Sequence, residues 1–230
     1  MSTRKDEALK NIFNEFGEFA NLVLHQLDLL GKIVTSGNTT LPKDVVKEIL
    51  DNENKIDKLE VKLSDKITDY IVLYQPLATD LRKIIAAFRI IINLERIGDL
   101  VTSIIRFIEK IKTPEVYVSL TEVIANMHMQ SSIMVNKALL SFTNDDREFA
   151  IWTIKNDSVV DEINQKMLNK AIKKSNISEE NKELLITFIN MNGVVSNIER
   201  IADYATNIAE AAIYSIEGKD IRHKPIDKQI

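Results

Sequence analysis

The amino-acid sequence predicts an all-α protein made of two tandem, duplicated three-helix bundles, with six long antiparallel helices related by a pseudo-twofold. The first observation is a repeat: Asn93–Asp99 (NLERIGD) recurs as Asn197–Asp203 (NIERIAD), 104 residues later. A repeat at a fixed offset is typical of a duplicated structural unit. The second observation is composition. Only 6 Gly and 4 Pro occur in 230 residues, 28% of residues are charged and 6% are aromatic, which favours long helices over a sheet.

Composition also excludes several kinds of protein and site. The chain has no Cys, so disulfides, thiolate metal sites and Cys nucleophiles are absent. Its longest apolar runs, such as Ile90–Ile92, are far shorter than the ~20 residues of a membrane span, and the N-terminus has no signal-peptide core. The net charge is −4, with Lys and Arg scattered among acids, so we expect no nucleic-acid partner. These features together predict a soluble, cytoplasmic protein.

The first half contains three predicted helices. Apolar residues at three-and-four spacing predict an amphipathic helix over about 6–32. A turn cluster separates it from a second helix over about 42–74, which Gln75-Pro76 ends because the residue before Pro disfavours helical geometry. Thr79 or Asp80 can cap a third helix that reaches about residue 111.

The second half repeats this plan. Thr113 can cap a fourth helix that begins at Pro114 and reaches about residue 142. A cap at 143–145 leads into a fifth helix that ends near residue 174, and a sixth helix ends near Gly218. We therefore predict domains at 1–112 and 113–218, followed by a polar tail, 219–230, that need not be ordered.

Acids four residues apart occur at matching positions in both halves: Glu53 and Asp57, Glu95 and Asp99, Asp157 and Asp161, Glu199 and Asp203. Residues at this spacing lie on one helix face, with Cβ atoms about 5–6 Å apart. The pairs also interrupt apolar seams; in the third helix the predicted seam leads into Glu95 from Leu81, Ile85, Phe88 and Ile92. One such pair is commonplace in a helical protein, but four pairs repeated by duplication indicate a site.

Placing these acids together costs energy. Like charges at this spacing oppose an exposed helix by roughly 0.2–0.5 kcal/mol, and an unpaired buried carboxylate costs several kcal/mol. Arg96 and Arg200 could compensate, but each follows its Glu by one residue and so lies about 100° around the helix. A hard cation is the alternative, because oxygen ligands suit Fe³⁺, Mn²⁺, Mg²⁺, Ca²⁺ or Zn²⁺. Helices two and three would form one site and helices five and six the other, unless the acids simply line a solvated groove.

These sequences resemble the PhoU family, the phosphate-signalling accessory proteins of bacteria. The resemblance covers nearly the whole chain and rests on four stretches taken together: Leu94–Asp99, Ile198–Asp203 with the following Ala205 to Glu210, Gln75–Arg82, and Gly218–His223. Two departures stand out. Ala202 replaces the family's usual Gly, and Asp157 stands where the first half has Glu53, which shortens the reach to a metal by one methylene.

The resemblance implies a function without catalysis. It implies that the eight acids bind metal, in a mononuclear or multinuclear site. It also implies that the protein restrains phosphate uptake and the phosphate-starvation response, by contacting the ATP-binding subunit of the phosphate transporter and a sensor histidine kinase. We expect a homodimer that reaches the membrane only through these partners.

Two alternatives stay open. One is a carboxylate-bridged di-metal enzyme, but its usual Glu-x-x-His signature is missing, and we expect His25, His128 and His223 to be packing or surface residues. The other is a helical adaptor, or the soluble PhoU-like regulatory domain of a sodium–phosphate symporter. A chain that starts at Met1 without an upstream membrane segment favours a free-standing protein over that domain.

Overall fold

The computed structural model describes residues 4–173 and 182–222. Within these residues the chain forms seven helices and no strand: α1 (Arg4–Ser36), α2 (Lys43–Tyr74), α3 (Ala78–Ile108), α4 (Pro114–Val118), α5 (Thr121–Thr143), α6 (Arg147–Lys173) and α7 (Lys182–Glu217). The predicted all-α class is confirmed. None of the described helices combines the length and the apolar character that crossing a membrane requires.

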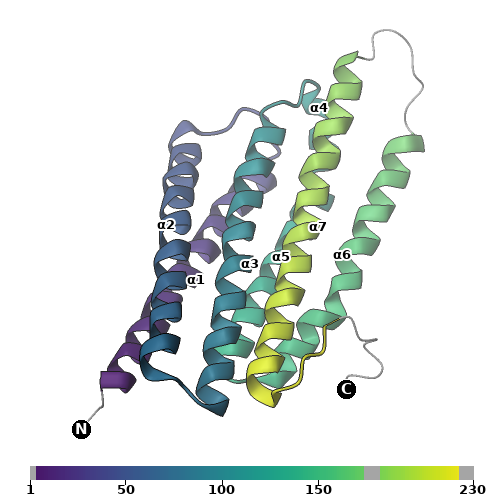
Figure 1. The fold of residues 1–230 in the computed structure, drawn as a ribbon. Coiled ribbons are helices and arrows are strands. Elements are labelled where there is room, and N and C mark those ends of the chain that lie inside the picture. The colour runs from purple at the N-terminus through teal and green to yellow at the C-terminus, as the bar shows by residue number, and fades with distance from the viewer. Residues whose placement is uncertain (1–3, 174–181, 223–230) are drawn as a thin grey trace.

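The two halves pack through α3 and α7, the equivalent helices of the duplication. These helices lie side by side at the centre of the molecule (Figure 1) and form its most extensive helix–helix contact. Helices α1 and α2 cover α3, while α5 and α6 cover α7, and α1 also packs against α5. Because the buried side chains of both halves form one hydrophobic cluster, the two bundles share a continuous core.

The predicted fourth helix is interrupted after its first turn and a half. The expected span of 115–142 consists of α4 and α5, separated by Ser119 and Leu120. Tyr117 is fully buried, and its carbonyl accepts both the Leu120 N–H (3.0 Å) and the Thr121 hydroxyl (3.1 Å). These local bonds compete with the regular helical pattern, so the chain turns here.

Two predicted caps are wrong. Helix α3 begins at Ala78 with Leu77 at the N-cap position, and Asp80 pairs instead with Lys5 of α1 at 3.0 Å. Helix α6 is capped by Asp146, one residue beyond the predicted 143–145 cluster. The Asp146 carboxylate accepts the backbone N–H groups of Glu148 (2.9 Å) and Phe149 (3.3 Å). Helix α3 thus begins without a side-chain cap, and α6 is capped one residue later than predicted.

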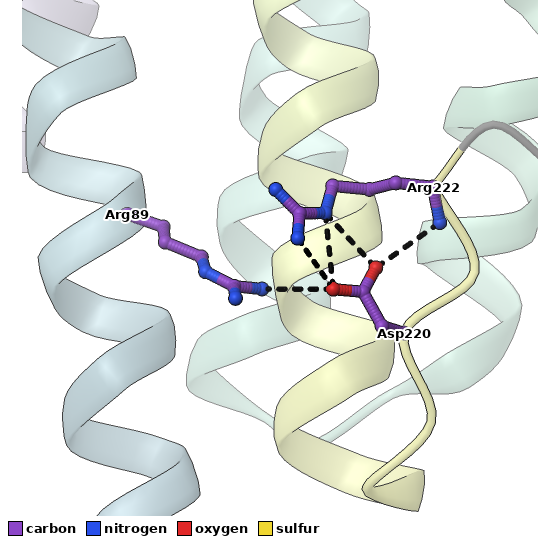
Figure 2. A network of polar contacts seen from close by, with 3 residues as sticks. All are labelled: Arg89, Asp220 and Arg222. Carbon is purple, nitrogen blue, oxygen red and sulfur yellow. Dashed lines mark hydrogen bonds and ion pairs between the residues drawn. The ribbon is translucent and has the colours of Figure 1, made fainter.

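The first residues of the predicted tail pack against the bundle. Ile221 is buried, and the Asp220 carboxylate accepts hydrogen bonds from Arg222, the shortest at 2.6 Å, and lies 3.6 Å from Arg89 of α3 (Figure 2). Arg89 also lies over the ring of Tyr214, 4.8 Å from its centroid. The hydrogen bonds from Arg222 lower the pKa of Asp220 to about 2. Residues 223–230 of the predicted tail, which include His223, lie outside the described residues.

Candidate functional site

Helices α2 and α3 bring the four predicted acids of the first half together. The negative charges of Asp57 and Asp99 both act on Glu53 and on Glu95 and raise the pKa of each. Glu53 and Glu95 are half-buried, whereas Asp57 and Asp99 are exposed. The acids predicted to lie together on the second and third helices are therefore close to each other in the structure.

Glu53 is the most perturbed of these acids. Its Oε2 accepts a hydrogen bond from Gln26 Nε2 of α1 at 2.8 Å, while its Oε1 is buried without a hydrogen-bond partner in the described chain. Burial, then the hydrogen-bonding proximity and charge of Asp99, and last the charge of Asp57, raise the pKa of Glu53 to about 8, although the bond from Gln26 acts in the opposite direction. Burial and the charge of Asp99 also raise the pKa of Glu95.

Helices α6 and α7 repeat this cluster in the second half. Asp157 feels the charges of Asp203, Asp161 and Glu199, and its Oδ1 is buried without a hydrogen bond to any described residue. Burial, followed by the charges of Asp203 and Asp161, raises the pKa of Asp157 to about 6. Burial and Asp161 likewise raise the pKa of Asp203, with Arg200 opposing them.

The donor chemistry of both clusters fits a hard cation. Every candidate ligand is a carboxylate, and one oxygen without a partner lies at the same position of each half, on Glu53 and on Asp157. A cation would satisfy these oxygens and offset the mutual repulsion of the acids. As they stand, however, no three Asp, Glu or His side chains of the described residues are arranged to hold a metal ion. Coordination would therefore draw the carboxylates closer together.

The seam predicted for the third helix is displaced. Leu81, Ile85, Phe88 and Ile92 are only half-buried, and the fully buried positions of α3 include Ile84, Ala87, Ile91 and Leu94. The physical reason is that α3 packs against α1, α2 and α7, so most of its circumference carries apolar residues and no single stripe identifies the core face. Glu95 and Asp99 consequently lie at the edge of the core.

Gln26 is a site residue that the sequence analysis missed. It is fully buried on α1 and donates to Glu53 and, at 3.4 Å, to the carbonyl of Gly98. A signal was available, because Gln130 follows Gln26 by the same 104 residues as the acids and lies half-buried on α5. A polar residue repeated at the offset of the acids marks a position that the cluster uses.

The two described histidines lie outside the acid clusters. The ring Nε2 of His25 is 2.8 Å from Glu48 on the surface. His128 is buried on α5, and its Nε2 is 3.0 Å from the carbonyl oxygen of Leu27, so this nitrogen carries the proton and donates it. For these two residues the prediction of surface and packing roles is confirmed, and neither completes a Glu-x-x-His metal site.

The arginines of the repeated motifs offset the acids beside them only partly: the charge of Arg96 acts to lower the pKa of Glu95, and that of Arg200 acts to lower the pKa of Asp203. Arg96 and Arg200 line a cavity of about 520 Å³ together with Arg106, Glu53, Asp57 and Asp99. None of these three arginines forms an ion pair with a carboxylate of the described residues. The cavity lies between α2, α3 and α7, so both halves of the chain contribute to it.

Comparison with known proteins gives a consistent result. The model of the PhoU domain matches this chain twice, at residues 16–108 and 124–212. A phosphate-specific transport system accessory protein PhoU homolog from Aquifex aeolicus is 30% identical and covers 95% of this chain and 98% of its own length. A protein of the same description from a Burkholderia species is 27% identical over 93% of this chain and 94% of its own.

Solved structures show the same fold. PhoU from Pseudomonas aeruginosa is similar with a TM-score of 0.79 at 23% identity, and covers 93% of this chain and 99% of its own. The phosphate transport system regulatory protein PhoU from Streptococcus pneumoniae gives 0.80 at 20% identity, over 94% of this chain and 99% of its own. At these identities the likeness concerns the fold.

Proposed function

Because this chain belongs to the PhoU family, we propose that it is a non-enzymatic, metal-binding regulator of phosphate uptake and of phosphate-starvation signalling. The observation that carries the proposal is the repeated cluster of four acids, part of them half-buried, present in both halves of a chain that the PhoU model covers twice. The relatives' description as transport accessory proteins supports a role without catalysis.

Each half would hold metal through its own four acids. Glu53, Asp57, Glu95 and Asp99 would bind in the first half, and Asp157, Asp161, Glu199 and Asp203 in the second. Fe, Mn, Mg, Ca and Zn all accept such oxygen ligands. The bound cation would supply positive charge between two helices of one bundle, and so fix their spacing. Gln26 orients the carboxylate of Glu53 toward α3.

The regulation would act through protein contacts in the cytoplasm. We propose the ATP-binding subunit of the phosphate transporter and a phosphate-sensing histidine kinase as partners, and a homodimer as the working form. Exposed apolar side chains support contacts of this kind: Leu73 and Leu77 are 71% and 80% exposed at the α2–α3 turn. Apolar surface of this sort is typical of interaction sites when it is contiguous.

Metal content tests the first part of the proposal. Elemental analysis after dialysis should find metal on the wild type and a partial loss in Glu95→Ala/Asp99→Ala, because the acids of the second half remain. A matched control is Asp65→Ala/Asp69→Ala, because these exposed acids have the same spacing on α2 but are not repeated in the second half. Absence of metal from a folded wild type would reduce the clusters to a solvated groove, and equal loss in the control would remove their specificity.

Retention by a partner tests the second part. The purified chain should be retained by the ATP-binding subunit of the phosphate transporter and should show no turnover alone. Robust hydrolase or oxidase activity of the purified protein would contradict the non-enzymatic role. Failure to bind either partner, in metal-loaded and metal-free form, would contradict the proposed mode of regulation.

A further inference from the structure

Three arginines line the cavity between the halves. Arg96 and Arg106 project from α3 and Arg200 from α7, and Thr102 and Ser103 add hydroxyl groups to the same lining. Other arginines of the described chain, such as Arg89, Arg147 and Arg222, are paired with carboxylates. The three cavity arginines form no such pair with any described residue, although Asp99 of α3 and Glu53 and Asp57 of α2 also line the cavity.

Tyr204 holds two of these like charges near each other. The guanidinium carbon of Arg96 lies over the Tyr204 ring, 5.8 Å from its centroid, and Arg200 Nη2 lies 3.4 Å from the Tyr204 hydroxyl oxygen. Arg96 and Arg200 are equivalent residues of the duplication, so the packing of α3 against α7 directs both toward one cavity. Two cations gathered in this way repel each other unless an anion lies between them.

The duplication also shows that the arrangement is particular to one half. The position equivalent to Arg106 is Glu210, and the position equivalent to Tyr204 is Leu100. A cavity built from the equivalent residues would therefore have Glu210 in place of Arg106. It would also have Leu100 in place of the Tyr204 ring that contacts two arginines. Only the observed cavity combines three arginines with Tyr204, which is the composition expected of a site for a tetrahedral oxyanion.

We propose that this cavity binds a phosphate group through Arg96, Arg106 and Arg200. Guanidinium groups donate paired hydrogen bonds to phosphate oxygens. Ser103, whose hydroxyl can also donate, lines the same cavity. A volume of about 520 Å³ accommodates inorganic phosphate and also a larger phosphate-bearing molecule. Both kinds of ligand carry the phosphate group that the arginines would bind. Comparing inorganic phosphate with ADP shows which kind the cavity prefers.

Metal bound to Glu53, Asp57 and Asp99 would strengthen this site, and in that one respect the inference rests on the proposed function. Asp57 and Asp99 line the same cavity and repel an anion when no cation is bound to them. A cation bound to them reverses that effect. Phosphate affinity should therefore be higher in the metal-loaded protein than after chelation, whereas the requirement for the arginines should be the same in both forms.

Calorimetric titration at low ionic strength tests the site, because exposed charges are screened by salt. Inorganic phosphate and ADP are titrated separately into the wild type, Arg106→Gln, Arg200→Gln and Arg147→Gln, each in metal-loaded and chelated form. We expect each cavity variant to weaken binding by about tenfold, the scale of one lost charge-assisted hydrogen bond. Arg147→Gln removes the same charge outside the cavity and should leave affinity unchanged.

The outcomes separate this inference from the metal proposal. Binding of either probe that depends on Arg106 and Arg200, but not on Arg147, supports the site, and the tighter probe identifies the source. Absence of binding in both forms overturns it, as does equal weakening in all three variants. Metal content, measured on the same samples, judges the acid clusters independently, and circular dichroism confirms that the exposed substitutions leave the helices intact.

Discussion

Glu53 occupies its position because residue 98 has no side chain. A Cβ atom at Gly98 would lie 3.0 Å from Glu53 Oε2 and 3.2 Å from Ile56 Cδ1. In the second half the equivalent residues are Asp157, which is one methylene shorter, and Ala202, which is buried. The two halves therefore differ in a compensating manner. The longer Glu53 faces Gly98, and the shorter Asp157 is paired with the larger Ala202.

A double-mutant cycle tests this compensation. Gly98→Ala should lower the free energy of unfolding by about 1–3 kcal/mol, because the methyl group displaces the carboxylate from Gln26 and outweighs the gain in helix propensity of about 0.5–1 kcal/mol. Adding Glu53→Asp should restore most of that loss, since it copies the pairing of the second half. Urea unfolding of the two single variants and the double variant measures the coupling, and strictly additive effects would contradict it.

His128 predicts a specific dependence of stability on pH. Burial lowers its pKa from 6.5 to about 4, although the hydrogen bond to Leu27 and the charge of Asp28 act in the opposite direction. Between these values the unfolded chain binds a proton that the folded chain does not, so stability falls as the pH decreases from 6.5 to 4. The loss is on the order of 3 kcal/mol at its limit, and it is absent above pH 6.5.

The matched variant is His128→Leu, because Leu24 occupies the equivalent position of the first half. This variant loses a buried hydrogen bond at every pH, but its stability should decrease less than that of the wild type between pH 6.5 and 4. Subtracting the two pH profiles removes the contribution of the carboxylates that titrate in the same range. Parallel profiles would show that the pKa of His128 is the same in the folded and the unfolded chain.

At the scale of helices, Gly193 allows α7 to approach α3 closely. A Cβ atom at this position would lie 2.8 Å from three atoms of the Phe107 ring. Gly17 provides the opposite case within α1, because no atom lies within 4 Å of the position its Cβ would take. Both glycines lie inside long helices and have helical backbone conformation, so they differ only in what surrounds them.

Alanine substitutions at these two glycines should have opposite effects. Gly17→Ala should stabilise the protein by about 0.5–1 kcal/mol through backbone entropy and helix propensity. Gly193→Ala gains the same amount but forces Phe107 or α7 to move, and we expect a net loss of about 1–2 kcal/mol. Thermal unfolding of both variants measures the difference, and Phe107→Leu should recover part of the loss. A stabilised Gly193→Ala would show that the α3–α7 contact adapts at no cost.

The helices were predictable from the sequence where the signal lay within the segment itself, in the spacing of its apolar residues and in its Pro residues. Three-and-four spacing, Gln75-Pro76 and Pro114 locate six segments whose outer ends agree with the structure to within a few residues, although the fourth segment consists of two helices. The break between α4 and α5 was not predictable, because it depends on the bonds accepted by the Tyr117 carbonyl once that side chain is buried. The buried face of α3 also escaped prediction, since three neighbouring helices cover it.

At the scale of the whole molecule, the duplication predicted part of the candidate site. The offset of 104 residues identified which acids belong together, and α2 with α3 and α6 with α7 bring them together as expected. The arginine cavity was not predictable in this way. It depends on how α7 packs against α3, and neither the composition of one helix nor the repeat determines that relative placement.

The shared core predicts that the halves unfold as one unit. Leu63 is fully buried on α2, which packs mainly on α1 and α3, while Trp152, the single Trp, lies on α6 of the other half. Leu63→Ala should cost about 2–5 kcal/mol. Because α3 and α7 join the cores, Trp152 fluorescence and far-UV circular dichroism should shift to the same lower urea midpoint. A Trp152 transition that keeps the wild-type midpoint while the circular dichroism shifts would show that the bundles fold independently.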